Sequence, residues 1–458
     1  MTVVETDSAG TGMRSLWGDA LPEEWHVMPL KRLTTHVSRG NTPDYVDDGP
    51  TRVLNQACVQ WSGLKPDACK YHADANVVGS KGELRPNDIV INSTGTGTLG
   101  RVQLFVLQGT WMADGHVTIA RCDSSKLEPR FLRYVLSARP VQDYIYAALV
   151  VGATNQIELN VARLRAMLVP VPPLPEQRAI AAFLDRETAR IDELVAKRGE
   201  MIAMLGARRS ALLEQTIRGE AKSGVPAVET GNRWIPQLPS GWLLIRARHV
   251  IDYISSGSRG WGDYYADEGA VFIRSADLQR NSVEIHLSDA AHVILPREAE
   301  GVRTRVRQHD VLVGITGANV GYVGYIRDPV GEAYVSQHVA LVRPRPDVYG
   351  EWLVYALSAP SVAAQLVAEQ YGGTKQQLSL ENISNLWLAL PPQLNQASIA
   401  RRIGEGIGRT ASIVASHERS MKRLLERRQA LITAAITGQI DIPPTHVADG
   451  ASAAVLVQ

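Results

Sequence analysis

The stretch that decides the fold of this 458-residue chain is Val169–Gly219, which begins VPVPPLPEQRAIAAFLDRETARIDELVAKR and ends ALLEQTIRG. Pro175 suits the first turn of a helix, and Glu176 places negative charge at the positive end of the helix dipole. No further proline occurs up to Ile217, and apolar residues recur every three or four positions. The heptad-like pattern predicts one helix of about 42 residues, roughly 60 Å long, where helices usually have about 11–12 residues.

A second stretch repeats this design. Leu390–Gly438 contains LPPQLNQASIARRIG and ends RRQALITAAITG, and an offset of 219 positions pairs Gln177 with Gln396. The register is kept to the far end of both stretches, so the chain is predicted to be a tandem duplication. The second copy differs in Asn395 and in three glycines at positions 404, 406 and 408. These glycines predict either a looser half of the helix or a close approach to its partner.

The two helices are the natural partners for each other, because an isolated apolar seam would be exposed to water. We therefore predict an antiparallel coiled coil. The predicted helix–helix packing residues are Ile180, Leu184, Ile191, Leu194, Met201, Leu205 and Leu212 in the first helix and Ile399, Ile403, Ile413, Leu424 and Leu431 in the second.

Each helix follows a module of short β-rich segments and glycine loops. The modules open with Leu21-Pro22-Glu23-Glu24-Trp25 and Leu238-Pro239-Ser240-Gly241-Trp242. The fold class is predicted to be α/β (α+β), with two modules of about 150 residues joined by the helices. The expected organisation is a flexible N-terminus at 1–20, a first module at 21–172, the first helix at 173–219, a polar linker at 220–237, a second module at 238–391, the second helix at 392–440 and a disordered tail at 441–458.

Composition excludes several classes of protein. Hydrophobic residues make up 45% and charged residues 21%, and the net charge is +1, so DNA binding would need a local basic face. The longest apolar run, Ile145–Ala153, is far shorter than the roughly 20 residues of a membrane span. Cys58, Cys69 and Cys122 have no CxxC spacing, which argues against zinc or a disulfide framework and favours a reducing cytoplasm.

The motifs do not indicate catalysis. Gly95–Gly100 matches GxGxxG, but the following Arg101–Val106 looks like a strand rather than a helix, so a turn is favoured over a dinucleotide site. The sequence contains no GxxxxGK[ST] loop, no HExxH and no DPPY- or NPPY-like tetrapeptide. His116 and His338 recur at equivalent positions, where a structural role is favoured. The pattern is that of a binding protein without a metal site.

PPLPEQRAIAAFLD, together with the helix that ends near IRG, resembles the central conserved region of type I restriction–modification specificity subunits. PPQLNQASIARR resembles the C-terminal conserved region of that family, and the LP..W openings match the starts of its target recognition domains. The resemblance covers about Leu21–Ile442. It implies a non-catalytic, DNA-binding subunit in which each target recognition domain reads one half of a bipartite site and the helices fix the spacer.

The resemblance also implies partners: double-stranded DNA, two methyltransferase (M) subunits and motor-nuclease (R) subunits, with no membrane. S-adenosylmethionine, ATP and Mg²⁺ would belong to those subunits, so no cofactor is expected here. Two alternatives remain: a specificity subunit of a related methyltransferase–nuclease system outside type I, and a two-module scaffold that does not bind DNA.

The base contacts do not follow from the resemblance, and the candidates come from side-chain chemistry. Polar and arginine-bearing loops can reach groove edges and phosphates, and three alternating arginines would give a strand one basic face. The candidate DNA-binding residues are Arg39, Asn41, Thr42, Thr94, Thr96 and Arg101 in the first module and Ser258, Arg259, Arg303, Arg305, Arg307, Thr316, Asn319, Tyr322 and Lys375 in the second.

Overall fold

The computed structural model describes Trp17 and residues 21–152, 157–219, 225–280, 282–285, 287, 289–295, 302–369 and 377–442. The chain divides into two compact units, residues 1–197 with 420–458 and residues 198–419. Each unit contains one module of the repeat and part of each long helix. None of the helices in the described ranges has the length and apolar character that a membrane crossing requires.

Two four-stranded sheets form the frame of the first unit. One has the order β2-β11-β8-β9 and is antiparallel throughout. The other has the order β10-β4-β7-β3, in which β10 and β4 are parallel. The strands are β2 (Thr34–Arg39), β3 (Tyr45–Val46), β4 (Thr51–Leu54), β7 (Lys70–His72), β8 (Ile89–Asn92), β9 (Val102–Leu104), β10 (Trp111–Ala113) and β11 (Val117–Cys122).

The second unit repeats both sheets with the same neighbours. Their orders are β18-β25-β22-β23 and β19-β21-β20-β24. The central strands β8 and β22 are buried at all four positions, as expected of apolar runs covered on both faces. The strands are β18 (Ile251–Ser256), β19 (Tyr265–Ala266), β20 (Ala270–Ile273), β21 (Ala291–Val293), β22 (Val311–Gly314), β23 (Val323–Tyr325), β24 (Ala333–Val335) and β25 (Val339–Pro344).

Shorter strand pairs complete the units. One antiparallel pair in each unit joins the start of the module to the residues before the long helix. The pairs are β1 (His26–Pro29) with β14 (Leu168–Val171), β17 (Leu243–Arg246) with β26 (Trp387–Leu390), β5 (Val59–Gln60) with β6 (Gly63–Leu64), β12 (Val150–Val151) with β13 (Glu158–Leu159) and β15 (Ala227–Glu229) with β16 (Gln237–Pro239).

Short helices pack on the sheets, and two long helices follow the modules. Phe131 and Leu132 share the core of the first unit with Ile89 and Ile91, and Trp352 and Leu353 share that of the second with Val311. The helices are α2 (Pro129–Ser137), α3 (Arg139–Tyr144), α4 (Val161–Ala166), α5 (Leu174–Ile217), α6 (Gly350–Leu357), α7 (Pro360–Glu369), α8 (Leu380–Ser384) and α9 (Gln393–Ile436). Helices α5 and α9 each have 44 residues, and their bounds differ by the offset of 219 found in the sequence.

A buried glutamine anchors each long helix to its module. The Gln177 side-chain oxygen accepts a hydrogen bond from the backbone N–H of Glu128 (2.8 Å), the residue before α2. The Gln396 oxygen accepts the equivalent bond from Tyr349 (2.8 Å), the residue before α6. The glutamine of the repeated sequence therefore accepts a hydrogen bond from a backbone N–H at the start of another helix. Without it, this buried N–H would have no partner within its own helix.

Each long helix ends at a glycine that contacts the opening of a module. Gly219 and Gly438 both have φ +72°, a conformation that favours glycine at a helix end. A Cβ at Gly219 would lie 2.3 Å from Pro239, and one at Gly438 would lie 2.4 Å from Pro22. The Pro-x-x-Trp openings thus pack on the glycines that terminate the helices, which explains why both motifs are duplicated.

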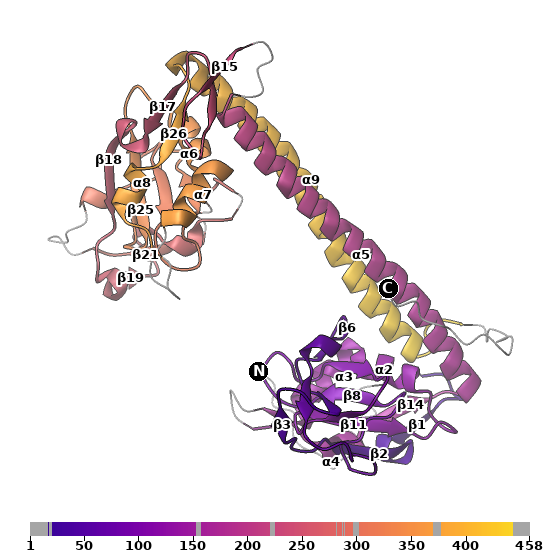
Figure 1. Cartoon of the computed structure of the whole chain (residues 1–458). Helices are drawn as coiled ribbons and strands as arrows, with labels where there is room; N and C mark the ends of the chain where they lie inside the picture. The colour runs from indigo at the N-terminus through magenta and orange to yellow at the C-terminus, as the bar shows by residue number, and fades with distance from the viewer. Residues whose placement is uncertain are drawn as a thin grey trace. The chain divides into compact units, whose positions relative to one another are not determined.

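Within each unit, the segments of α5 and α9 run antiparallel, side by side (Figure 1). Within the first unit, Arg428 Nε lies 3.0 Å from Asp192 Oδ1. Within the second, the Arg198 guanidinium hydrogen-bonds His417 Nδ1 at 3.3 Å. Arg198 and His417 are equivalent positions of the repeat, as expected at the centre of an antiparallel pair of related helices.

The seam between the helices differs from the predicted one. Leu194, Met201 and Ile413 are 40%, 41% and 46% exposed, so these three predictions were wrong. The heptad period is correct, but in this part of the helices the seam lies one residue further along. It consists of Leu184, Thr188, Ile191, Val195, Arg198, Ile202, Leu205, Arg209, Leu212 and Thr216 in α5, and of Ile403, Ile407, Thr410, Val414, His417, Met421, Leu424, Arg428, Leu431 and Ala435 in α9.

Two segments expected to lack structure are partly ordered. Within the predicted linker, Ala227–Glu229 pairs with Gln237–Pro239, and Ile235 is buried with Leu238. In the predicted flexible N-terminus, Trp17 is buried in the first core, and its Nε1 donates to the backbone oxygen of Leu168 (3.1 Å). Both corrections have one physical reason: a large apolar side chain in a polar stretch finds a place in the core. The tail from residue 443 lies outside the described residues.

Candidate nucleic-acid interface

The sheet register brings three loops of the first module together. The last residues of β2 and β8 face the start of β11, as shown by the pairs Arg39–Thr118 and Asn92–Val117. Because antiparallel neighbours run in opposite directions, the loops after β2 and β8 meet the loop before β11. We call residues 39–42, 94–101 and 114–116 the first loop edge. It contains all six candidates of the first module.

The second module has an equivalent edge. Ser256 of β18 and Gly314 of β22 face Ala340 and Val339 at the start of β25. We call residues 256–259, 316–322 and 336–338 the second loop edge. It brings together the candidates Ser258, Arg259, Thr316, Asn319 and Tyr322, which belong to two separate loops.

A threonine–histidine pair lies at the centre of each edge. Thr94 Oγ1 is 2.9 Å from His116 Nδ1, and Thr316 Oγ1 is 2.8 Å from His338 Nδ1. The His116 backbone N–H donates to the Asp114 carboxylate (2.9 Å), whose pKa is raised by burial. Each histidine therefore joins the glycine loop to the sheet. These bonds fit the structural role favoured by the sequence, while both histidines are exposed and the threonines are half-buried.

The glycine loops are tight connections between strands. Gly95, Gly97 and Gly100 have φ between +84° and +88°, and the loop leads into β9. This confirms the turn predicted in place of a dinucleotide site. Thr96 at the tip is exposed. Arg101 instead braces the loop, since its guanidinium bonds the Gln60 side chain (2.5 Å) and the Gly97 oxygen (2.8 Å).

Asn319 and Tyr322 of the second edge also have internal contacts. The Asn319 amide donates to the backbone oxygens of Ser275 (2.8 Å) and Leu278 (3.3 Å). Tyr322 is half-buried against the apolar cluster that contains Leu278. These two residues shape the edge, so they are weaker candidates for base contacts than Thr96.

The loops after β2 and β18 pass very close to a neighbouring strand. A Cβ on Gly40 would lie 2.0 Å from the Ala113 oxygen, and one on Gly257 would lie 2.0 Å from the Val335 oxygen. The glycines hold the loops in place, and the residues after them project outward. Thr42 and Arg259 are exposed, and Asn41 and Ser258 are half-buried. Before the glycine of the first loop, Arg39 forms an ion pair with Glu158 (3.2 Å).

The three alternating arginines of the second module lie on one exposed face, as predicted, although not in a strand. Arg303 belongs to a short 3-10 turn, and Arg305 forms an isolated bridge with Tyr334. All three side chains are exposed, whereas Thr304 and Val306 between them are buried. The antiparallel bridge places Arg303 toward the second loop edge and Arg307 away from it.

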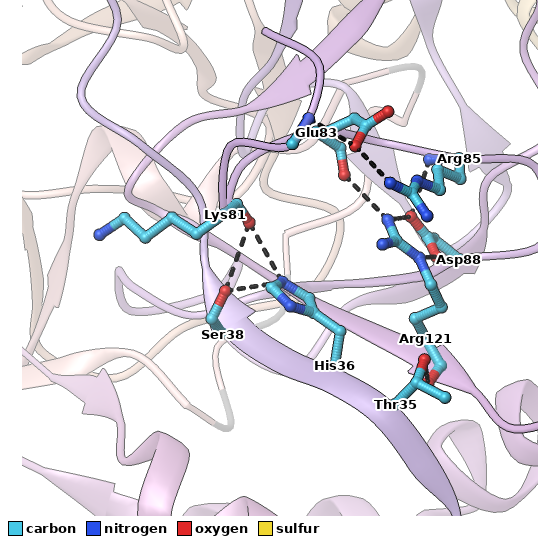
Figure 2. A network of polar contacts seen from close by, with 9 residues as sticks. Thr35, His36, Ser38, Lys81, Glu83, Arg85, Asp88 and Arg121 are labelled. Atoms are coloured by element: carbon cyan, nitrogen blue, oxygen red, sulfur yellow. Dashed lines mark hydrogen bonds and ion pairs between the residues drawn. The ribbon is translucent and has the colours of Figure 1, made fainter.

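The equivalent positions of the first module are Lys81, Glu83 and Arg85, at an offset of 222 residues. Glu83 and Arg85 form an ion pair at 2.7 Å (Figure 2), and the bond from Arg85 lowers the pKa of Glu83. The formal charge of the three positions is thus +1 in the first module and +3 in the second.

The same buried ion pair lies behind the three alternating positions of each module, 81, 83 and 85 in the first and 303, 305 and 307 in the second. Arg121 donates through Nε and Nη2 to Asp88 at 2.7 and 2.8 Å (Figure 2), and Arg343 does so to Asp310 at 2.8 and 2.8 Å. Each carboxylate also accepts the backbone N–H three residues before it, which closes a tight turn. Asn87 and His309 in these turns both have positive φ, +70° and +73°. The ion pair fixes the turn that precedes the central strand.

The sequence did not single out the turn after β20. Arg274 lies there beside Asp277, next to a cavity of about 320 Å³ lined in part by Trp261, Tyr265 and Phe272. The duplication could have indicated it, because the offset of 219 aligns Arg274 with Asn55 in the turn after β4. Ser258 and His338 also line this cavity, which connects it to the second loop edge.

Two observations complete the inventory. The described residues contain no group of three or more His, Cys, Asp or Glu side chains able to hold a metal ion. The candidate Lys375 lies outside the described residues, as does the stretch 153–156 that precedes β13.

Comparisons with known proteins agree with these features. The family model "Type I restriction modification DNA specificity domain" matches residues 70–202, the later part of the first module and the first part of α5. The chain is 26% identical to the EcoBI type I specificity subunit of Escherichia coli over 62% of this chain and 60% of that protein. It is 24% identical to a putative MjaX specificity subunit of Methanocaldococcus jannaschii over 43% of this chain and 46% of that protein.

Longer matches extend over nearly the whole chain. The EcoKI specificity subunit of E. coli K12 is 21% identical over 92% of this chain and 90% of that protein. A solved structure concerning complex assembly and conformational transition of the type I R-M system has a TM-score of 0.66 at 18% identity, covering 92% of this chain and 99% of that one. This likeness shows the fold. The matched stretch spans only about half to 60% of the length of the first two curated relatives.

Proposed function

We propose that this chain, which belongs to the family of type I restriction–modification specificity subunits, selects the DNA sequence on which a methyltransferase–nuclease complex acts. Each module reads one half of a bipartite site, and α5 and α9 set the spacer between the halves. The chain itself performs no reaction. S-adenosylmethionine, ATP and Mg²⁺ act in the methyltransferase and motor-nuclease subunits.

The observation that supports this proposal most is the pair of loop edges on matching frames. The Thr–His pair, the buried Asp–Arg pair and the sheet order recur, whereas the other exposed residues of the loop edges differ. A repeated frame can approach DNA backbone in the same way twice, and different exposed side chains then contact different bases. This arrangement suits an asymmetric site with two halves.

The exposed apolar residues of the long helices support docking of partner subunits. Leu194 and Ile413 are equivalent positions of the repeat, and they are 40% and 46% exposed. Apolar side chains that lie off the seam on matching faces are typical of protein interaction sites. Two matching faces would bind two copies of one partner, which we propose to be the methyltransferase.

The test is selection of DNA by the assembled complex. The chain is co-expressed with its methyltransferase, and the purified complex is mixed with a pool of randomised duplexes. We expect enrichment of two short defined blocks separated by a spacer of fixed length and free composition. The methyltransferase alone serves as control and should enrich nothing. Equal recovery of all duplexes at every salt concentration would refute DNA recognition by this chain.

A further inference from the structure

The turn after β20 differs from its counterpart after β4 although both have the same place in the frame. In the first module, the Asn55 amide is only 9% exposed and is bonded internally to Ala57 N (2.8 Å) and Ala68 O (3.0 Å). In the second module the equivalent residue is Arg274, whose side chain is 39% exposed. The second module therefore has a partly exposed guanidinium at a position where the first module has a buried, hydrogen-bonded amide.

Asp277 holds the Arg274 side chain from one side. Arg274 Nε and Nη2 lie 3.4 and 3.2 Å from the two carboxylate oxygens, and its backbone N–H donates to Asp277 at 2.7 Å. The hydrogen bonds to Asp277 and Tyr265 raise the pKa of Arg274. Tyr265 also hydrogen-bonds the guanidinium, and a guanidinium has five N–H donors, so those that Asp277 and Tyr265 do not take remain for a ligand.

The surroundings of Arg274 suit a base more than a phosphate. Trp261 stacks on Phe272 with ring centroids 5.5 Å apart, and both line the cavity beside the guanidinium. Tyr265 stands at the rim with half its surface exposed. Trp261 and Phe272 are each only 4% exposed, so Tyr265 is the aromatic side chain of this group that a base could reach. Asp277 offsets the local positive charge, which weakens any attraction for phosphate but keeps the planar donor fork in one orientation.

We infer that Arg274 reads a guanine in the half-site of the second module, with two N–H groups of its guanidinium donating to O6 and N7 of that base. Arginine with guanine is the commonest specific contact in the major groove, and its two bonds need a planar fork held in one orientation. The inference rests on the proposed function. If the two modules recognise different half-sites, Arg274 accounts for part of that difference.

The experiment uses the selection described above, with complexes that contain wild-type chain, R274A or R274K. We expect R274A to weaken binding to the selected duplex by about tenfold to a hundredfold and to erase guanine preference at one position of one half-site. R274K keeps the charge but loses the planar arrangement of donors, so it should retain less of the guanine preference than the wild type. The other half-site should be read unchanged by both variants.

The matched control is R345A, since Arg345 is also exposed and paired with a nearby acid, Asp347 at 3.2 Å. It should bind and select as the wild type does, and thermal unfolding of each complex confirms that the variants are folded. Two outcomes overturn the inference: guanine preference that survives in both Arg274 variants, or uniform weakening on all duplexes, which indicates a phosphate contact. A wild-type complex that selects no sequence would instead refute the proposed function.

Discussion

The two modules agree in the ion pairs that fix their turns and differ in the exposed residues in front of those pairs. Asp88 with Arg121 and Asp310 with Arg343 have nearly identical geometry. Directly in front of these pairs, Glu83 is replaced by Arg305, which reverses a charge. The residues that fix turns and helix starts recur in both modules, whereas several exposed residues differ. The comparison distinguishes the internal contacts that recur in both modules from the exposed positions that we propose contact DNA.

The largest predicted effect is the loss of stability of a module when its buried carboxylate is removed. Asp88→Ala or Asp310→Ala leaves a mostly buried guanidinium and a backbone N–H without their partner, which should cost about 3–5 kcal/mol in the module concerned. Amide hydrogen exchange in β8 and β22 reports the two modules separately. The exposed Asp143, 3.9 Å from Arg139, provides the control D143A, with an expected change below about 0.5 kcal/mol. A large cost in only one module would show that the frames are not equivalent.

The smallest effect concerns the glycines of α9. Gly408 has open space around its Cβ position and corresponds to Ala189 in α5, so Gly408→Ala should stabilise the helix by about 1 kcal/mol. A Cβ on Gly406 would lie 2.3 Å from Leu212 Cδ2, so Gly406→Ala should gain less because Leu212 must move. Hydrogen exchange in α9 measures both. Equal gains would show that Gly406 does not serve close packing.

The sequence predicted the architecture because the repeat provided an internal alignment. The bounds of α5 and α9, the antiparallel pairing and the turn at Gly95–Gly100 follow from heptads, proline and glycine. The seam was misplaced at Leu194, Met201 and Ile413 because the true seam contains Arg198, Arg209 and His417, which an apolar pattern passes over. Of the two possibilities for the α9 glycines, Gly406 fits close packing.

The candidate interface was predicted only at the level of loops. Two loops of each module were named separately, and the register on β11 and β25 is what places them together. Which side chains are already engaged depends on contacts between residues far apart in the sequence. Asn319 bonds Ser275, and Arg101 bonds Gln60. The local sequence motif does not reveal these internal contacts, so it could not show that both residues are weaker candidates for DNA contact. Arg274 was missed because its significance lies in its difference from Asn55.

The central claim is that α5 and α9 set the distance between the two half-sites, and a heptad deletion tests it most directly. Removing residues 195–201 and 414–420, equivalent stretches of the repeat, keeps the seam in register. It shortens each helix by about 10 Å, which corresponds to about three base pairs at 3.4 Å each. The account predicts that the complex then selects the same two blocks with a spacer shorter by about that amount. The same blocks with an unchanged spacer would contradict it.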